Sequence, residues 1–549
     1  MKLSTYSAIA AISVGMIAGA PAISSAASCG DVNGNGSVTV ADVVKLFQDA
    51  LSSADPADCD GAGTLQCGDI NESGTITVSD VVAAFSLVLG EELLYECESE
   101  GPTISCPGGT AVVSSNVVTN EVWPASCRIE LDGTIFVTDS AVLKIEPGAT
   151  IFGRKSSSDN SPSALVVRRD AKLNAAGTAN DPIFFTSDQT PGTRVAGDWA
   201  GLAINGSGPV NCPNNECNAE GLENTLFGGN DANDSSGVIQ YVNVSFAGDE
   251  LTVDNELNIF TLNGVGAKTV LDHIHAHMGL DDGYEWFGGN SESFYVISSA
   301  AADDTFDWQI GFRGSMQYGY GRQYDGNIDD DGSRGYEGDN NENAYDANPR
   351  SQPKFCNVTL MGTNGQPGDT GNRAMVLRRG TEFQIGQNLA YNFEGDGFQI
   401  RNFETMNAAC STTNEVASVA NLTGNSFIMD SGFWIMGDDL WDDRDADGAN
   451  CTIDQLGSAF VEMGLIWGDI GDTQPAGGDT MTDPGIDANC LSSGFNCDPV
   501  PTNAASVASD LDCSSIDPSF DDNTYIGAFA PNGENWADES NAWVDYSIN

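Results

Sequence analysis

The alternation of hydrophobic and polar residues predicts that most of the chain consists of short β-strands. From about residue 121 the sequence runs through segments such as VWPASCRIELDGTIFVTDSAVLKIEPGATIFG, in which apolar and polar positions alternate. Turn-forming pairs interrupt the alternation at Asp132-Gly133 and Pro147-Gly148. A period of two residues places one face of a strand in the core and the other in solvent. We therefore expect a mainly β body over residues 121–549, with a loop-rich part from about residue 438.

A weak internal repeat indicates how these strands are arranged. The segment DDGYEWFGG at Asp281 returns as DDTFDWQIGFRG at Asp303, 22 residues later, and looser copies begin at Asp254, Glu394 and Met429. A period in the low twenties suits one coil of a solenoid built from three short strands and their turns. Each coil would bury its inward side chains by stacking on the next coil. The sequence thus predicts a right-handed parallel β-helix, and the alternative is an array of β-sandwiches.

The first hundred residues carry a helical pattern instead. CGDVNGNGSVTVADVVKLFQDAL begins at Cys29, and CGDINESGTITVSDVVAAFSLVL begins at Cys67, 38 positions later. In each copy a short polar loop precedes apolar residues at helical spacing, such as Val43, Phe47 and Leu51 in the first. The repeat therefore predicts one unit of loop plus helix, written twice.

Both loops carry the oxygen-bearing residues of a twelve-residue calcium loop. Such a loop uses side-chain oxygens at positions 1, 3 and 5, a backbone oxygen at 7, a contact at 9 and a carboxylate at 12, with glycine at 6 for the turn. Glycine stands at position 6 in both copies, as Gly36 and Gly74. The expected cofactor is calcium, and the predicted ligands are Asp31, Asn33, Asn35, Ser37, Thr39 and Asp42 in the first loop and Asp69, Asn71, Ser73, Thr75, Thr77 and Asp80 in the second.

Paired loop-plus-helix units with Asp at position 12 resemble the dockerin domain, a module that docks proteins onto cohesin domains. The resemblance covers about residues 29–98 and implies a cohesin-like partner. The alternative is that the ions only fold a small domain, because a segment this short has little core of its own. We expect a dockerin-like domain over residues 28–98 and a linker over residues 99–120.

Residues 1–27 have the features of a secretory signal peptide. Lys2 supplies the charged start, residues 8–20 an apolar run, and SSAAS the small residues for cleavage. Fourteen cysteines, an even number, fit the disulfides of an exported protein. The spacing predicts three disulfides, Cys29–Cys59, Cys67–Cys97 and Cys212–Cys217. We therefore expect a secreted or cell-surface protein.

The net charge restricts the partners. Asp and Glu number 79 against 21 Lys and Arg, for a formal charge of −58. Such a surface repels nucleic acid and anionic lipid and attracts cations. Beyond the signal peptide no segment is apolar for long enough to span a bilayer. We expect no nucleic-acid partner and no membrane-spanning segment.

The body contains two further candidate metal sites. All three histidines of the chain lie in DHIHAHM, where His273, His275 and His277 would share one face of a strand. Neighbours would be about 6.6 Å apart along the strand, which allows two imidazoles to bind one transition metal. The alternative is an outward polar row. Separately, DRDADGANCTID places four carboxylates at positions 1, 3, 5 and 12 of another calcium loop, namely Asp443, Asp445, Asp447 and Asp454; a weaker loop lies near Asp329.

Four ordered motifs of the body resemble a group of large secreted bacterial β-helix proteins of mostly unknown function. They are LKIEPGATIFG at Leu143, GDWAGLAI at Gly197, DDGYEWFGG at Asp281 and GAFAPNGENW at Gly527. The resemblance implies the fold, but a fold does not determine an activity.

Three functions remain open on the sequence alone. The first is a secreted, calcium-binding surface or matrix protein whose β-helix presents a glycan or protein binding face. The second is a carbohydrate-active enzyme, either a polysaccharide lyase or a glycosidase, for which no catalytic residue is assigned. The third is a transition-metal protein using the histidine row. Candidate bases and sugar-stacking rings are Arg313, Arg322, Arg334, Arg401, Trp286, Trp308, Tyr318, Tyr320 and Tyr324, although these rings are equally suited to filling coil corners.

Replacing the first ligand of both N-terminal loops tests the calcium prediction. We expect Asp31→Ala combined with Asp69→Ala to abolish calcium-dependent folding of residues 28–98, because each loop loses a charged ligand. Calorimetric titration with calcium measures the effect, and unchanged calcium uptake by the double variant would refute the assignment.

Overall fold

The computed structural model describes residues 102–408 apart from 223, 253–254, 329–332, 364–372 and 394–397. It also describes short stretches between 427 and 468, and residues 485–549 apart from 492–494, 496, 506 and 508–512. These residues belong to one compact unit, Ser99–Asn549. The signal peptide, both N-terminal calcium loops and the disulfides Cys29–Cys59 and Cys67–Cys97 lie outside the described residues and stay predictions.

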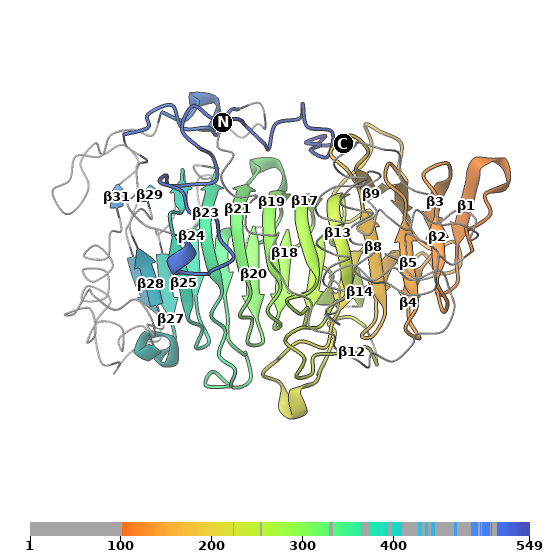
Figure 1. Ribbon diagram of the computed structural model, residues 1–549, viewed down its shortest axis with the longest axis horizontal. Helices are drawn as coiled ribbons and strands as arrows, with labels where there is room; N and C mark the ends of the chain where they lie inside the picture. Colours follow the sequence, from red (N-terminus) through yellow and green to blue (C-terminus); the bar gives the residue numbers. More distant parts are fainter. Residues whose placement is uncertain are drawn as a thin grey trace, which may run out of the picture. The chain divides into compact units, whose positions relative to one another are not determined.

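The body is a parallel β-helix whose coils follow one another from β1 to β31 (Figure 1). Successive strands run through three faces in the same order in each coil. Among the described residues, faces 1 and 2 together form a 17-stranded sheet and face 3 forms a 10-stranded sheet. The ladders between coils are parallel, so the alternative of β-sandwiches is wrong.

Short separate strands make up faces 1 and 2 at both ends of the described body. On face 1 they are β2 (Glu121–Trp123), β5 (Val142–Ile145), β8 (Lys172–Ala176), β25 (Phe383–Gly386) and β28 (Phe427–Asp430). On face 2 they are β1 (Thr110–Val113), β3 (Arg128–Leu131), β6 (Thr150–Gly153), β9 (Ile183–Ser187), β26 (Leu389–Tyr391), β29 (Trp434–Met436) and β31 (Ile466–Gly468). Strand β1 pairs with β3, so the sheet already begins inside the range expected to be a linker.

In the central coils one long strand covers both faces. These strands are β13 (Gly237–Ser245), β17 (Val270–Gly279), β19 (Glu292–Ala301), β21 (Ser315–Arg322) and β23 (Lys354–Met361). Each has a residue in the left-handed conformation at the corner between the two faces, with φ between 49° and 62°, and each ladder skips that residue. Strands β17 and β19 contain a second such residue near their ends, Met278 and Ala300. The bend turns the strand from face 1 to face 2, and the bend residues are Tyr241, His273, Tyr295, Tyr318 and Asn357.

Face 3 lies between the end of one face-2 strand and the start of the next face-1 strand. Its strands are β4 (Thr134–Val137), β7 (Ala164–Val167), β10 (Gly201–Asn205), β16 (Phe260–Asn263), β18 (Tyr284–Phe287), β20 (Phe306–Gln309), β22 (Arg334–Gly338), β24 (Arg373–Leu377), β27 (Phe398–Arg401) and β30 (Trp441–Arg444). Two antiparallel hairpins extend from these coils, β11 (Cys217–Asn218) with β12 (Leu226–Phe227) and β14 (Glu250–Thr252) with β15 (Asn255–Glu256). Short 3₁₀ turns are η2 (Pro107–Gly109), η3 (Pro213–Asn215), η4 (Asp325–Asn327), η5 (Ala488–Leu491) and η6 (Cys513–Ser515).

The 22-residue repeat is confirmed as one coil. Glu285 pairs with Asp307 and Trp286 with Trp308 in the ladder between β18 and β20. Both tryptophans are buried in the core, so they fill coil corners and do not stack on a ligand. The looser copy at Asp254 begins 27 residues before Asp281. The ladder instead pairs Phe260 with Tyr284, an offset of 24 residues. The copy at Met429 also differs, because its strand β29 belongs to face 2.

The C-terminal segment, residues 485–549, packs against the outside of the sheet formed by faces 1 and 2. Its regular structure consists of 3₁₀ turns in the described part. Phe529 and Trp543 bury their rings in one cluster with Tyr320 of β21. The Cys356–Cys513 disulfide links the segment to β23. This packing places residues far apart in the sequence beside each other.

Four disulfides lie within the described residues. Cys212–Cys217 is confirmed. The other three are Cys106–Cys127, Cys356–Cys513 and Cys490–Cys497, none of which the spacing revealed. None of the helices in the described part of the chain has the length and hydrophobicity of a transmembrane segment.

The disulfide between β23 and the C-terminal segment is expected to contribute more stability than the local one. Cys356 and Cys513 are 157 positions apart, whereas Cys212 and Cys217 are 5 apart, and loop-closure entropy grows with loop length. Changing Cys356 and Cys513 together to Ala should cost about 2–4 kcal/mol and expose the segment to protease. Denaturant titration and limited proteolysis measure this; the matched control changes Cys212 and Cys217 to Ala, and equal losses would contradict the prediction.

Candidate functional site

The three histidines do not form the single row that alternation predicted. His273 occupies the left-handed bend of β17, with φ 52°, and is skipped by the ladder. Its ring stacks between Tyr241 and Tyr295, with centroids 4.4 Å from each. The bend breaks the period of two, and this is why His273 leaves the face shared by His275 and His277.

His275 and His277 lie beneath the C-terminal segment and are almost fully buried. The Oγ of Ser299 lies 2.8 Å from both His275 Nε2 and His277 Nδ1. The second nitrogen of each ring also has a protein partner, the Asn243 side chain for His275 and the Ser547 carbonyl for His277. His275 and His277 therefore point outward from the coils, but the C-terminal segment covers them, and their ring nitrogens contact protein groups. The transition-metal hypothesis stays a prediction.

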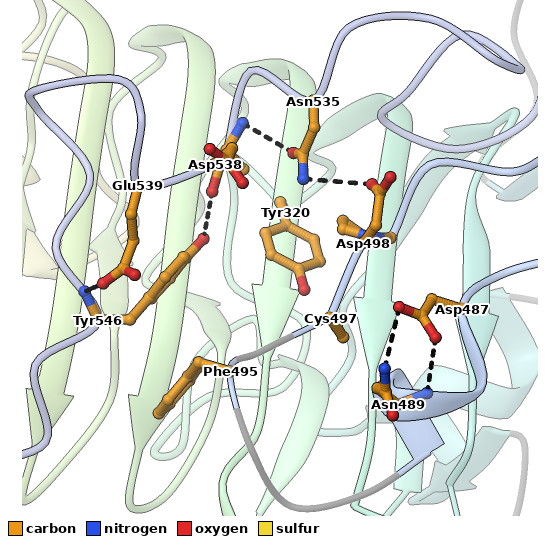
Figure 2. A pocket seen from close by; sticks show the side chains of 12 residues that line it. Tyr320, Asp487, Asn489, Phe495, Cys497, Asp498, Asn535, Asp538, Glu539 and Tyr546 are labelled. Atoms are coloured by element: carbon orange, nitrogen blue, oxygen red, sulfur yellow. Dashed lines mark hydrogen bonds between the residues drawn. The ribbon is translucent and has the colours of Figure 1, made fainter.

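A cavity of about 470 Å³ lies beside this histidine pair, between β21 and the C-terminal segment (Figure 2). Tyr320 of β21 lies in the middle of its lining, with Asp487 and Asp498 on one side and Glu539 and Tyr546 on the other. All lining residues other than Tyr320 come from the C-terminal segment. They are Asp487, Asn489, Phe495, Cys497, Asp498, Pro499, Asn535, Ala537, Asp538, Glu539 and Tyr546.

Aromatic rings give the cavity an apolar part. The rings of Phe495 and Tyr546 are parallel, with centroids 5.2 Å apart. The hydroxyl of Tyr546 donates to the Ala537 carbonyl at 2.9 Å, which fixes that ring. Phe495 lies between the two cysteines of the Cys490–Cys497 disulfide. A ring held by a hydrogen bond, as that of Tyr546 is, loses little entropy when a ligand binds.

The charges of the cavity are of one sign. Its lining includes four carboxylates, Asp487, Asp498, Asp538 and Glu539, and no Lys, Arg or His. Hydrogen bonds from Ser540 lower the pKa of Asp538, so this carboxylate is ionised at neutral pH. Asn535 donates to Asp498 at 3.3 Å, and the Tyr546 amide donates to Glu539 at 3.2 Å. The cavity therefore offers hydrogen-bond acceptors and negative charge.

The arginines considered as bases of a lyase have structural partners elsewhere. Arg322 is buried and donates to the Cys490 carbonyl at 2.6 Å. Arg334 pairs with Asp304 at 3.2 Å, and Arg313 donates to Gln352. Arg401 donates to Gln399. None of the four lines the cavity.

The predicted third calcium loop is described only at its start. Asp443 lies in β30, where it pairs with Ile400 of β27. Asp445, Asp447 and Asp454 lie outside the described residues, as do residues 329–332 of the weaker loop. Both calcium loops of the body stay predictions.

The buried histidine pair is expected to destabilise the fold in acid. Burial lowers the pKa of His277 from 6.5 to about 4, and that of His275 in the same direction. The unfolded chain thus takes up protons first as the pH falls below 6.5, and stability decreases down to about pH 4. For His277 the loss is on the order of 3 kcal/mol.

Denaturant titrations at pH 7 and pH 4.5 measure this loss. His277→Gln, which keeps groups able to bond Ser299 and Ser547, should show a smaller decrease than the natural chain. His273→Gln serves as the control and should leave the decrease in place. An unchanged decrease in His277→Gln would refute the role of the pair.

A family model described as a pectate-lyase-like β-helix domain matches residues 115–430. The match spans more than half of the 549 residues and covers the coils from β2 to β28. No curated protein and no solved structure matches the chain significantly. Parallel ladders, three faces and this match agree, and the chain belongs to the family of pectate-lyase-like β-helix domains.

Proposed function

We propose that the protein is an exported polysaccharide-binding protein whose cavity between β21 and the C-terminal segment holds a neutral or amino-sugar glycan. The observation that carries this proposal is the combination, in one cavity, of parallel aromatic rings with four carboxylates and two asparagines. Rings pack against the apolar faces of sugars, and carboxylates and amides bond to their hydroxyls. The volume is within the usual range of about 300–1,000 Å³ for small-ligand sites.

The charge of the cavity selects among polysaccharides. A polyuronate would bring its carboxylates against Asp487, Asp498, Asp538 and Glu539, with no cation in the lining to offset them. Like charges at close range disfavour binding, whereas a neutral sugar or a protonated amino sugar meets no such cost. A lyase acting on uronates is therefore the weaker form of the carbohydrate-active alternative.

A glycosidase remains the second candidate, because carboxylates line opposite sides of the cavity (Figure 2). Hydrolysis needs one carboxylic acid with a raised pKa beside an ionised partner. Asp538 has a lowered pKa, which suits a hydrogen-bond acceptor and not a general acid. Asp538 thus fits the role of the ionised partner, and no general acid is assigned. The dockerin-like module would attach the protein to a cohesin-like partner, and calcium would fold that module.

Binding assays on matched variants test this function. Isothermal titration with neutral, amino-sugar and uronate oligosaccharides should show binding of the first or second class and none of the third. Phe495→Ala should weaken binding about threefold to tenfold by removing a stacking ring. Glu539→Gln should weaken the binding of an amino sugar more than the binding of a neutral sugar.

Glu534→Gln is the matched control, because Glu534 is exposed in the same segment and does not line the cavity. Reducing-end release and the absorbance of unsaturated products, followed on the same glycans, detect hydrolysis and elimination. Tight binding of polyuronates alone, or equal affinities in all variants, would contradict the proposal.

A further inference from the structure

A second cluster of acidic residues lies on the outer side of face 3. Glu285, Asp307 and Glu337 occupy equivalent positions on β18, β20 and β22, so stacking places them in one line. Asp282 and Asp304 precede β18 and β20 in the same relation. All five side chains are at least nine-tenths buried, with exposed fractions of 1–6%. Burial of five carboxylates requires compensation by donors or cations.

Arginines compensate only one end of this cluster. Arg334 pairs with Asp304 and Glu337, both at 3.2 Å, and Arg378 pairs with Glu337. At the other end, Glu285 accepts bonds from the neutral amides of Asn258 and Gln309, at 2.6 and 2.7 Å. The Asp304 backbone amide donates to Asp282 at 2.8 Å. The β18 end thus holds carboxylates whose bonds come from uncharged donors.

Asp307 is the unsatisfied member. Its Oδ1 is buried and has no hydrogen-bond partner among the described residues. Burial and the charges of Glu285 and Glu337 raise the pKa of Asp307 well above its ordinary value. The pKa values of Asp282 and Glu285 are raised in the same way, with burial as the largest cause. Without a counter-ion these groups repel one another.

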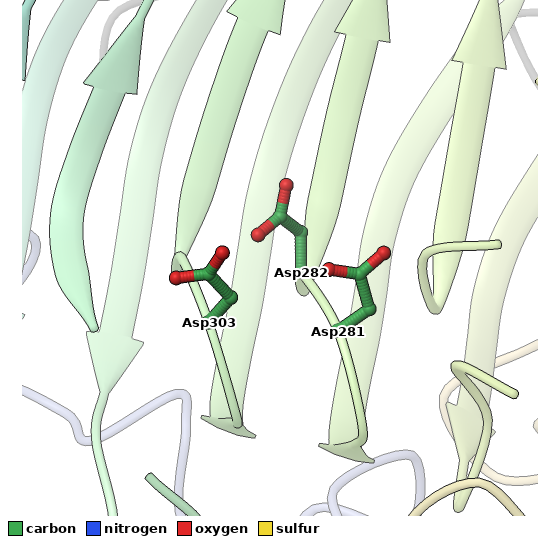
Figure 3. A group of neighbouring side chains, drawn as sticks. All are labelled: Asp281, Asp282 and Asp303. Atoms are coloured by element: carbon green, nitrogen blue, oxygen red, sulfur yellow. The ribbon is translucent and has the colours of Figure 1, made fainter. Parts of the chain in front are cut away.

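The oxygen atoms are spaced for a single ion. One oxygen from each of Asp282, Glu285 and Asp307 lies within 4.8 Å of the other two. Two ligands on opposite sides of a calcium ion lie about 4.6–5.2 Å apart. Asp281 and Asp303 are partly exposed and form an overlapping group with Asp282, so the cluster extends toward the surface at this end (Figure 3).

We propose that Asp282, Glu285 and Asp307 bind one divalent cation of the calcium type, which links the coils of β18 and β20. The three ligands are carboxylate oxygens, which hard cations such as calcium prefer. The site lies on face 3, whereas the cavity proposed for a glycan lies against β21 and the C-terminal segment. The two proposals are therefore independent.

Calcium content of the full chain tests the site. Exhaustively dialysed protein is loaded with Ca²⁺ alone, and bound metal is counted by elemental analysis. Asp307→Asn and Glu285→Gln should each bind one ion fewer per chain than the natural protein. Glu342→Gln, at an exposed position, is the matched control and should bind the same number. The N-terminal loops are present in every variant, so any calcium that they bind adds the same number of ions to each count.

Thermal unfolding with and without Ca²⁺ separates ligation from packing. In chelator, Asp307→Asn should melt above the natural chain because one buried charge is gone. In saturating Ca²⁺ the natural chain should melt above Asp307→Asn, since only the natural chain is stabilised by an ion at this site. Unchanged ion counts, or the same calcium-induced shift in every variant, would overturn the proposal. Circular dichroism confirms that each variant is folded. If Asp307→Asn does not fold, Glu285→Gln provides the test of the site.

Discussion

Stacking of one coil on the next in register is the constraint on which the rest of this structure depends. Parallel strands lie about 4.8 Å apart, so residues at equivalent positions of successive coils become direct neighbours. A residue type that repeats along the chain therefore forms a line in space. The bend residues Tyr241, His273, Tyr295 and Tyr318 form such a line of stacked rings, with centroids 4.4–4.8 Å apart.

The same constraint stabilises some lines and destabilises others. Stacked rings and amide ladders, such as Asn263 donating to Asn205, gain contact at each step. In a line of carboxylates, each further coil instead adds electrostatic repulsion, and burial strengthens that repulsion. Arg334 and Arg378 relieve that repulsion at one end of face 3. The proposed cation at Asp282, Glu285 and Asp307 would relieve it at the other end.

The C-terminal segment adds the features that stacking cannot produce. It buries His275 and His277, supplies all but one of the residues around the cavity, and is linked to β23 by a disulfide. Its aromatic side chains pack on Tyr320 and Ile297, which point outward from the coils. The glycan site proposed here thus depends on a segment without strands of its own in the described part, laid on a regular surface.

Local periodicity in the sequence determined the parallel β-helix, the pairing of Glu285 with Asp307 and the Cys212–Cys217 disulfide. These features depend on residues a few positions or one coil apart, and the amino-acid pattern records such relations directly. The sequence did not reveal the bend at His273, which breaks that periodicity. Burial of His275 and His277, the Cys356–Cys513 link and the cavity around Tyr320 were decided only by the tertiary structure. Each depends on contacts between residues more than 150 positions apart in the sequence. No local pattern specifies where such a distant segment packs.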